Sequence, residues 1–522
     1  MTSTDRIASR EWWLLAAATI AGAVLRIVAI GREALWGDEA LTYVLAQAPA
    51  QALARAPIDP TAPLYYWLHQ LLIPDGASAA AGRSIALVAG VLAIPAAFFL
   101  ARQLVGRGAW LVAAWVAVSA PLVDYSQEAR AYALLVLLIL LSALALHRAL
   151  DPAARRRGWL LATFVVTTLL ALYTHFVALF WAAPALLILV VESKRSGDRR
   201  RAVGAYLASA VVLIAFVPEL QRAWRYATEN NAFHWLEQPG PSGFARLLAS
   251  QWFPFGPLAF SAIAAALLVL LAAWQRRSIA QWARCDPAAA LILAALLLQP
   301  LGLWLFGFLV SPVIMPRTLL PSLPAVGLLI ALFLQPLGAR ARLACGTAVI
   351  AAALAATLIT GPVRRKEPWG AARAVLARAD MASDLILACP LWKAPALMAA
   401  TRGLAVAPLA TRLGGRLVLI EDKMGAEPRW ERLFYARAYR AVLARPMGVE
   451  PPVEAASTVP VRSLLLVSSE CEAEERAALA EQVGPFTIAQ RWTGAAPPGH
   501  AGITIERWVL DRPRSIALSV AR

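Results

Sequence analysis

Most of this chain consists of apolar blocks, and each block is long enough to cross a lipid bilayer. A helix needs about 20 apolar residues to cross the hydrocarbon core. Hydrophobic residues make up 60% of the sequence and charged residues 16%, against about 25% charged in a typical soluble domain. The sequence therefore predicts a polytopic α-helical membrane protein. We expect eleven spans, at residues 12–30, 83–103, 108–124, 131–149, 158–174, 175–193, 202–220, 257–275, 287–310, 317–337 and 343–362.

The sequence becomes more polar after about residue 363, and strand-like runs then alternate with helix-like runs. That alternation is typical of a small α/β domain. We expect strands near 384–390, 416–422, 463–470 and 502–510, and helices near 395–403, 430–444 and 472–484. The chain is therefore predicted to have a transmembrane domain at 1–362, whose first outer loop is about 31–82, and an outer α/β domain at 363–522.

Basic residues are enriched in alternate loops, for example at Arg155–Arg157 and Arg199–Arg201. Such enrichment marks the cytoplasmic side of a membrane protein. It predicts a cytoplasmic N-terminus and an extracytoplasmic C-terminal domain, which in a bacterium means a multi-pass protein of the inner membrane facing the periplasm. It also explains most of the net charge of +17, so no nucleic-acid partner is predicted.

The stretch "ALWGDEALTYVL" places Asp38 and Glu39 side by side just after the first span. Carboxylates near lipid are costly unless they face a polar cavity or a partner. One interpretation is a pair of solvated loop acids at the start of a helix, where negative charge is favourable. The other is a catalytic pair, in which Asp38 is a general base and Glu39 orients it or holds a metal.

Further polar residues gather on the predicted outer side. The stretch "DYSQEARAY" places Glu128, Arg130 and Tyr132 at the mouth of the fourth span. They are interpreted as lining a substrate cavity, or alternatively as an interfacial belt in which Tyr and Arg sit at headgroup level. Arg26, inside the first span, is the nearest charge to the middle of the membrane.

Two histidines and an arginine complete the candidate substrate-binding residues. His175 lies in "LYTHF", and His234 lies in a long loop that is predicted to be a lid or pocket wall. Arg317 begins a proline-rich span, and an arginine there can hold a phosphate by two hydrogen bonds. The alternatives are a satisfied polar histidine, an ordinary structured loop and an arginine anchored at the membrane surface.

The sequence also lacks several common motifs. It has no GxxxxGK[ST], GxGxxG, HExxH or DxD, so a nucleotide-bound donor is not predicted. A lipid phosphate in the same membrane is the more economical carrier for a sugar. The four cysteines form no CxxC motif. Cys389 and Cys471 each follow a strand-like run on the oxidising side, where either a disulfide or two buried thiols would fit.

Five stretches occur in a characteristic order: "ALWGDEALTYVLA", "APLYYWLHQLL", "YSQEARAYALL", "YTHFVALF" and "PRTLLPSLPAVGLLIA". Together they resemble the bacterial polyprenyl-phosphate-dependent glycosyltransferases of the GT-C superfamily, whose relatives include protein O-mannosyltransferases and the aminoarabinose transferases that act on lipid A. The resemblance covers roughly residues 10–340. It implies a GT-C-like fold for that part of the chain.

The resemblance also implies roles for individual residues. Asp38 corresponds to the family's proposed general base, with Glu39 beside it. Glu128, Arg130 and Tyr132 correspond to residues lining the same cavity, and Arg317 to the arginine of an "R-Y-L-x-P" element. Two positions depart from the pattern: Thr318 stands in place of Tyr, and Thr61 stands where relatives often have His.

The predicted reaction moves a sugar from polyprenyl phosphate to a hydroxyl of an envelope acceptor, which is a glycan, a lipid or a protein. The acceptor attacks opposite the phosphate, so the configuration is inverted. The sequence identifies no certain cofactor, and a divalent cation held by Asp38, Glu128 and His175 stays an open alternative. A glycolipid transporter or flippase is the competing function, and a non-catalytic scaffold is a third.

Overall fold

The structure is a computed structural model of the chain. It divides into two compact units, which are described separately. Unit 1 comprises Met1–Ile30, Asp59–Tyr65 and Arg83–Val363, and unit 2 comprises Gly31–Ile58, Tyr66–Gly82 and Arg364–Arg522. The residues described are 9–28, 30–46, 61–74, 77–106, 108–229, 236–254, 258–360, 367–379, 384–390, 393–401, 404, 407–413, 416–421, 453–495 and 502–521.

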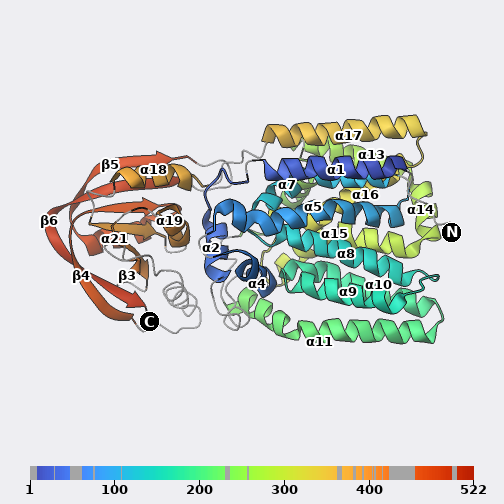
Figure 1. Ribbon diagram of the computed structural model, residues 1–522, viewed down its shortest axis with the longest axis horizontal. Helices are drawn as coiled ribbons and strands as arrows, with labels where there is room; N and C mark the ends of the chain where they lie inside the picture. The colour runs from blue at the N-terminus through green and yellow to red at the C-terminus, as the bar shows by residue number, and fades with distance from the viewer. Residues whose placement is uncertain are drawn as a thin grey trace. The chain divides into compact units, whose positions relative to one another are not determined.

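Unit 1 is a bundle of helices whose long members run side by side (Figure 1). Apolar blocks form helices here because a helix satisfies every backbone hydrogen bond within its own segment. The elements are α1 Ser9–Ile27, α5 Ala79–Leu104, α6 Ala109–Val118, α7 Ala120–Asp124, η1 Tyr125–Gln127, α8 Tyr132–Leu150, α9 Arg157–Leu172, η2 Phe176–Ala178, α10 Leu179–Arg195, α11 Arg199–Glu229, α12 Pro241–Trp252, α13 Leu258–Trp274, α14 Arg276–Cys285, α15 Pro287–Leu309, η3 Pro316–Ser322, α16 Leu323–Leu334 and α17 Ala339–Thr360.

Seven helices within the described ranges are long and apolar enough to cross a membrane, and the number rises to nine if each of two bent helix pairs is one span. The prediction of a polytopic membrane protein is confirmed. All eleven predicted spans are helical. The two outside this set are α1, with 19 residues, and α9, with 16 residues. The bent pairs are α6 with α7 and η1, at 61°, and α13 with α14, at 70°.

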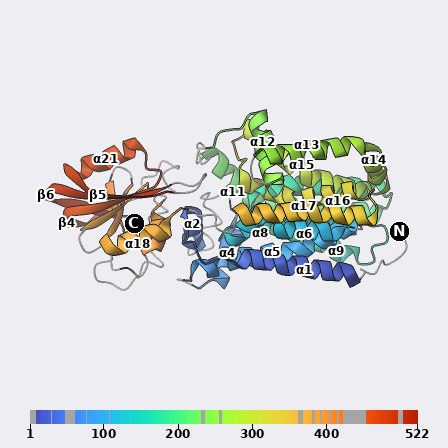
Figure 2. The ribbon, with the colours of Figure 1, turned by 90° about the horizontal axis from the view of Figure 1, so that it is seen from above.

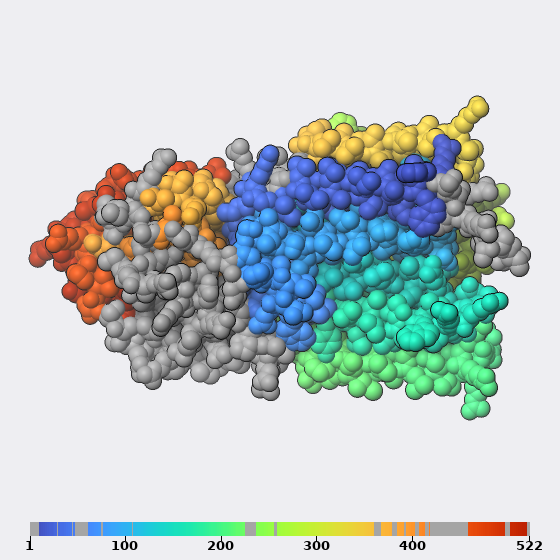
Figure 3. All heavy atoms as spheres, in the orientation of Figure 1, coloured from blue at the N-terminus to red at the C-terminus, as the bar shows by residue number. Residues whose placement is uncertain are grey.

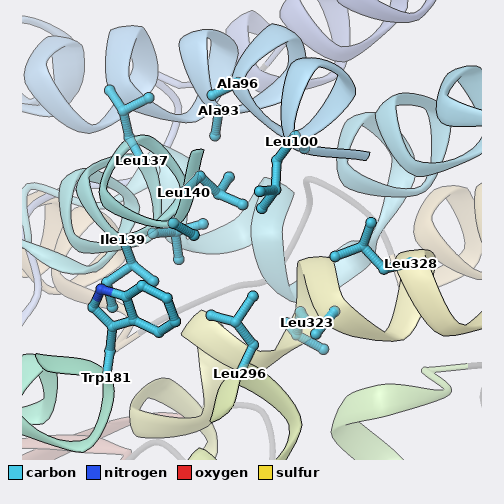
Figure 4. Close-up of a cluster of buried hydrophobic side chains, with 14 of the residues drawn as sticks. Ala93, Ala96, Leu100, Leu137, Ile139, Leu140, Trp181, Leu296, Leu323 and Leu328 are labelled. Carbon is cyan, nitrogen blue, oxygen red and sulfur yellow. The ribbon is translucent and has the colours of Figure 1, made fainter. Parts of the chain in front are cut away.

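The interior of unit 1 is apolar. Figure 4 shows Leu100 of α5, Leu140 of α8, Trp181 of α10 and Leu296 of α15 in one buried cluster. Large apolar side chains also cover the outside of α1, α11 and α13, and the α1 and α11 surfaces are visible in Figure 3. An apolar exterior around an apolar core is what lipid contact requires.

Unit 2 contains a six-stranded mixed sheet with the strand order β3-β2-β1-β4-β6-β5. Strand β1 is parallel to both β2 and β4, whereas β4 pairs antiparallel with β6. The elements are α2 Gly37–Ala46, α4 Pro63–Leu72, α18 Trp369–Ala379, β1 Leu385–Cys389, α19 Ala394–Thr401, β2 Leu409–Leu413, β3 Arg416–Glu421, β4 Val453–Ser468, α21 Ala473–Val483, β5 Phe486–Gly494 and β6 Ile503–Ala521. The division falls within two helices, so the first residues of α4 belong to unit 1 and the first residues of α5 belong to unit 2.

Helices cover both faces of this sheet (Figure 2). Ile386 and Ala388 of β1 pack in the same apolar cluster as α18 and α19. Leu385 and Leu387 pack in the cluster that contains α21. This alternation follows from the two-residue period of a strand. The predicted α/β domain is confirmed, and each predicted strand lies within an observed strand or overlaps one. The predicted helix at 430–444 lies outside the described residues.

The pairing of the two domain cysteines is now defined. Cys389, at the end of β1, and Cys471, just before α21, form a disulfide with 5.3 Å between their Cα atoms. Cys285 and Cys345 are free and exposed. Of the two alternatives that the sequence left open, the structure contains the disulfide.

Candidate functional site

The candidate site residues of unit 1 follow a bend between α6 and α7. Pro121 has no N–H, so the carbonyl of Ala117, four residues earlier, loses its helical donor. The fully buried Arg26 supplies one: its guanidinium donates to Ala117 O at 2.9 Å and to Val116 O at 2.9 Å. It also donates to Ser126 Oγ at 3.1 Å. Arg26 therefore stabilises the broken span.

The sequence analysis did not assign Arg26 a role. The signal that could have found it is the combination of a charged residue inside a span with a proline in another span. Arg26 and Ser126 also line a small cavity together with Tyr125, Tyr132 and Leu320.

The segment after the bend carries three of the predicted site residues. Glu128 and Arg130 are buried, and Tyr132 is buried at the first position of α8. Glu128 has extended backbone, with φ −118° and ψ 138°, and the Arg130 N–H donates to Glu128 O at 2.7 Å. Because the helix begins only at Tyr132, Glu128 is not one helical turn before Tyr132 on a shared face.

Aromatic and charged side chains meet at Tyr132. Its ring centroid lies 5.5 Å from that of Tyr125 and 5.2 Å from that of His175. The guanidinium carbon of Arg317 lies 6.0 Å from the Tyr132 ring centroid, within the range of a cation–π contact. Three stretches distant in sequence, around 128–132, 175 and 317, are thus brought together in unit 1. We call Tyr132, His175 and Arg317 the Tyr132 cluster.

The two motifs "TAPLYY" and "LYTHF" pair through their backbones. Thr61 forms an antiparallel bridge with His175. The Ala62 N–H donates to Thr174 O at 3.1 Å, and the Leu64 N–H donates to Tyr173 O at 2.9 Å. This pairing places His175 beside Thr61.

His175 is buried and precedes the short helix η2. The Val177 N–H donates to His175 Nδ1 at 3.2 Å. A neutral imidazole that accepts at Nδ1 carries its hydrogen on Nε2. The ring orientation of His175 is therefore fixed by backbone.

A buried ion pair near the end of α11 supports this pairing. Arg222 donates to both carboxylate oxygens of Glu219, with Nε at 2.9 Å from Oε2 and Nη2 at 2.6 Å from Oε1. Nη2 also lies 3.4 Å from Thr61 O. The sequence analysis identified neither Arg222 nor Glu219 as a site residue. The three-residue spacing of an acid and an arginine at a span end was the available signal.

Arg317 lies in η3, where prolines prevent a regular helix. Prolines at 316, 321 and 324 remove N–H donors. Thr318 restores order, because Met315 N–H donates to its hydroxyl at 3.0 Å and Gln299 donates to its carbonyl at 2.9 Å. Arg317 Nε donates to Met315 Sδ at 2.8 Å. The proline-rich start of this span is thus a 3₁₀ helix rather than an α-helix.

Asp38 and Glu39 belong to unit 2, in the first turn of α2. Glu39 is fully buried and Asp38 is half-buried. Glu39 is therefore not a solvated loop acid, and that alternative is wrong for this residue. Both carboxylates lie where the positive end of the helix dipole favours them. The grouping of Asp38 with Glu128 and Arg317 stays a prediction.

Two further predictions concern His234 and a metal. His234 lies outside the described residues. Among the described residues, one group has the spacing of a metal site: Cys389, Cys471 and Glu475. Its two cysteines are joined in the disulfide, so they are not thiolate ligands. The divalent cation stays a prediction.

His69 of α4 provides a pH-dependent element in unit 2. It is buried and its ring packs 4.6 Å from the ring of Tyr43. Burial lowers the pKa of His69 from 6.5 to about 4. The unfolded chain then binds a proton at higher pH than the folded chain. The contribution of neutral His69 to the unfolding free energy is therefore fully present above pH 6.5 and is lost as the pH falls towards 4.

We expect the wild-type protein to lose about 2 kcal/mol more unfolding free energy between pH 7.5 and pH 5 than His69→Phe does. Urea unfolding followed by tryptophan fluorescence at the two pH values measures this difference. Identical pH dependence in the two proteins would show that His69 is not buried in its neutral form.

Comparison with known proteins adds to this geometry. Residues 59–221 match the sequence profile of a family described as dolichyl-phosphate-mannose-protein mannosyltransferase. No curated protein matches the sequence with significance.

Three solved structures share the fold over most of the chain. ArnT from Cupriavidus metallidurans in the apo state is 15% identical, with a TM-score of 0.54 and coverage of 96% of this chain and 98% of that one. The same protein bound to undecaprenyl phosphate gives 14% identity, a TM-score of 0.53 and the same coverage. The apo oligosaccharyltransferase of Archaeoglobus fulgidus gives 12% identity, a TM-score of 0.51, and coverage of 99% and 77%.

These findings confirm three predictions. The family match, which covers residues 59–221, confirms the predicted resemblance there and the class of enzyme, a membrane glycosyltransferase. The structural matches confirm a GT-C-like fold with a C-terminal α/β domain.

Proposed function

We propose that this glycosyltransferase takes its sugar from polyprenyl phosphate and transfers it to a hydroxyl of an envelope acceptor outside the cytoplasm. The Tyr132 cluster is the observation that carries the proposal. Its residues come from stretches distant in sequence, and a polar cluster inside a membrane protein marks a substrate path more often than a structural feature. Similarity to a protein that was solved with undecaprenyl phosphate supports a lipid-phosphate donor.

The bonds made and broken define the reaction. The acceptor oxygen forms a bond to the anomeric carbon, and the bond from that carbon to the phosphate oxygen breaks. The leaving polyprenyl phosphate keeps the electron pair, and Asp38 accepts the proton of the acceptor hydroxyl. Attack opposite the phosphate inverts the configuration. The acceptor is a glycan, a lipid or a protein.

Arg317 is proposed to neutralise the charge that grows on the leaving phosphate, because a guanidinium pairs with two phosphate oxygens at once. Arg130 assists from the same part of unit 1. Tyr132 and His175 present a ring edge and an N–H, which suit the hydroxyls of a sugar. Glu39 is proposed to orient Asp38, and Glu128 and His234 to contact substrate.

The cell location follows the loop charges. We propose that the N-terminus lies in the cytoplasm and that Asp38 lies on the extracytoplasmic face, as the basic loops at 155–157 and 199–201 indicate. In a bacterium this is the periplasmic side of the inner membrane.

Purified protein in lipid nanodiscs tests the proposal against transport. A labelled sugar on polyprenyl phosphate is added with extracted envelope acceptors, and release of polyprenyl phosphate is measured. We expect release that depends on acceptor, with a product of inverted configuration by nuclear magnetic resonance. In liposomes, donor that crosses the bilayer while staying chemically intact would instead identify a flippase. Donor that is neither consumed nor moved would favour a scaffold.

A further inference from the structure

Glu367 makes three contacts that join distant parts of unit 2. Its carboxylate accepts hydrogen bonds from the Gly37 N–H at 3.1 Å and from Trp369 Nε1 at 2.6 Å. It also forms an ion pair with Lys393. Glu367 is 3% exposed and Lys393 is 4% exposed. We call these four residues the Glu367 link.

Gly37 is the first residue of α2, the helix that carries Asp38. The Ala40 N–H donates to Trp36 O at 2.9 Å and closes the first turn, so the Gly37 N–H has no partner within the helix. Glu367 supplies one, and its negative charge suits the positive end of the helix dipole. The residue after this contact is Asp38.

The rest of α2 packs into the core of the α/β domain. Ala40 belongs to the buried cluster that contains Trp369, Leu376 and Ile386, and Leu41 packs against that cluster. Helix α2 also contacts α19. The helix is therefore anchored by an apolar side and by a charged contact at its N-terminus.

The charged contact at Gly37 fixes the position of α2 along its axis more strictly than the apolar contacts do. Apolar contacts are non-directional, whereas a buried carboxylate with three donors tolerates little displacement. A shift of α2 along its axis would break the Gly37 contact and leave a buried donor unpaired. The Glu367 link therefore fixes where the first turn begins.

We infer that Glu367, held by Lys393, is a positioning residue for Asp38 and acts through the backbone of α2. This inference rests on the proposed role of Asp38 as general base. Small misplacement of a reacting group can cost about 10²-fold in rate. The residues after position 363 would thus be required for chemistry as well as for folding.

Glu506 offers a matched control in the same unit. It is a buried acid, 1% exposed, and it accepts a hydrogen bond from Trp508 Nε1, two residues later, at 2.9 Å. It also pairs with Arg476 and Arg491. Glu367 and Trp369 have the same spacing. These partners of Glu506 lie in β5, β6 and α21, so replacing it perturbs a similar contact without touching α2.

The main comparison is Glu367→Gln against Glu506→Gln. Lys393 also pairs with Glu470, whose carboxylate lies 3.2 Å from its ammonium. In Glu367→Gln the charge of Lys393 therefore still has an acidic partner. We expect Glu367→Gln to lower kcat about 10- to 100-fold with little change in KM for the donor. Glu506→Gln should lose as much thermal stability as Glu367→Gln does, but its kcat should stay within about twofold of the wild-type value. Equal loss of kcat in both variants would overturn the inference.

A second pair isolates the hydrogen bond. Gly37→Pro removes the N–H that Glu367 accepts, while proline is well suited to the first position of a helix. Gly37→Ala keeps the N–H, and an added Cβ would meet its nearest atoms at 3.7–3.9 Å, an ordinary contact. We expect kcat of Gly37→Pro to fall about as far below Gly37→Ala as Glu367→Gln falls below wild type. Equal kcat in the two glycine variants would contradict the inference.

Hydrogen exchange separates this inference from the proposed function. Amides of residues 37–46 should exchange about tenfold faster in Glu367→Gln than in Glu506→Gln, whether or not the protein transfers sugar. Absence of transfer by wild type, with this difference present, would refute the function but not the anchoring. If the wild type is active but residues 37–46 exchange equally fast in Glu367→Gln and Glu506→Gln, the anchoring alone is refuted.

Discussion

Asp38→Asn is expected to lower the rate of sugar transfer by about 10²–10⁴-fold, the contribution typical of a general base. Asparagine has nearly the same shape as aspartate but cannot accept the acceptor's proton. The change is compatible with folding, because the carbonyl of residue 38 still accepts the Thr42 hydroxyl contact seen at 3.2 Å. Loss of the favourable helix-end charge costs about 0.3–1 kcal/mol, too little to unfold a domain.

Single-turnover transfer from labelled donor measures this effect, with circular dichroism as the check on folding. Glu33→Gln is the matched control, because it removes another acid of the same loop and should keep the rate. Transfer at the wild-type rate by Asp38→Asn would exclude Asp38 as the base.

Arg317→Met is expected to lower kcat by about 10²–10³-fold, the loss typical when one group that stabilises developing negative charge is removed. The side chain lies over the Tyr132 ring, and methionine fills similar space without charge. Arg317→Lys should recover only part of the loss, because an ammonium cannot make the paired contact of a guanidinium. The effect should be larger on kcat than on KM for the donor, since the charge grows as the bond breaks.

Arg246→Met controls for the loss of a positive charge. Arg246 is exposed in α12, and that helix contacts η3, which carries Arg317. Steady-state kinetics over a range of donor concentrations separates the outcomes. If Arg317→Met changed KM alone, Arg317 would hold the donor in the ground state and would not assist departure of the phosphate.

Local patterns in the sequence predicted much of the fold. The spans are continuous apolar runs, and a bilayer leaves such runs little alternative to a helix. The strand-like runs that the sequence shows in the domain are rich in branched residues and bounded by polar residues, although β4 and β6 extend well beyond those runs. The residues of the Tyr132 cluster could be named because their motifs stand out against the long apolar runs beside them.

The sequence did not reveal contacts between distant segments. Nothing local indicates that Arg26 replaces the donor that Pro121 lacks, or that Thr61 pairs with His175, because these contacts depend on how spans pack. The extended backbone of Glu128 was also not predicted, because nothing local in the sequence shows that the helix begins only at Tyr132. Placing α2 in the domain core required knowledge of residues after 367.

The contact between Gly37 and Glu367 joins residues 330 positions apart, and this separation has a consequence for biogenesis. The ribosome adds roughly 5–20 residues per second, so α2 leaves it roughly 15–65 s before its partner does. During that interval the nascent chain holds its proposed base, Asp38, without the contact from Glu367. On the proposed role of Asp38, the newborn protein therefore becomes able to transfer sugar only after Glu367 has left the ribosome.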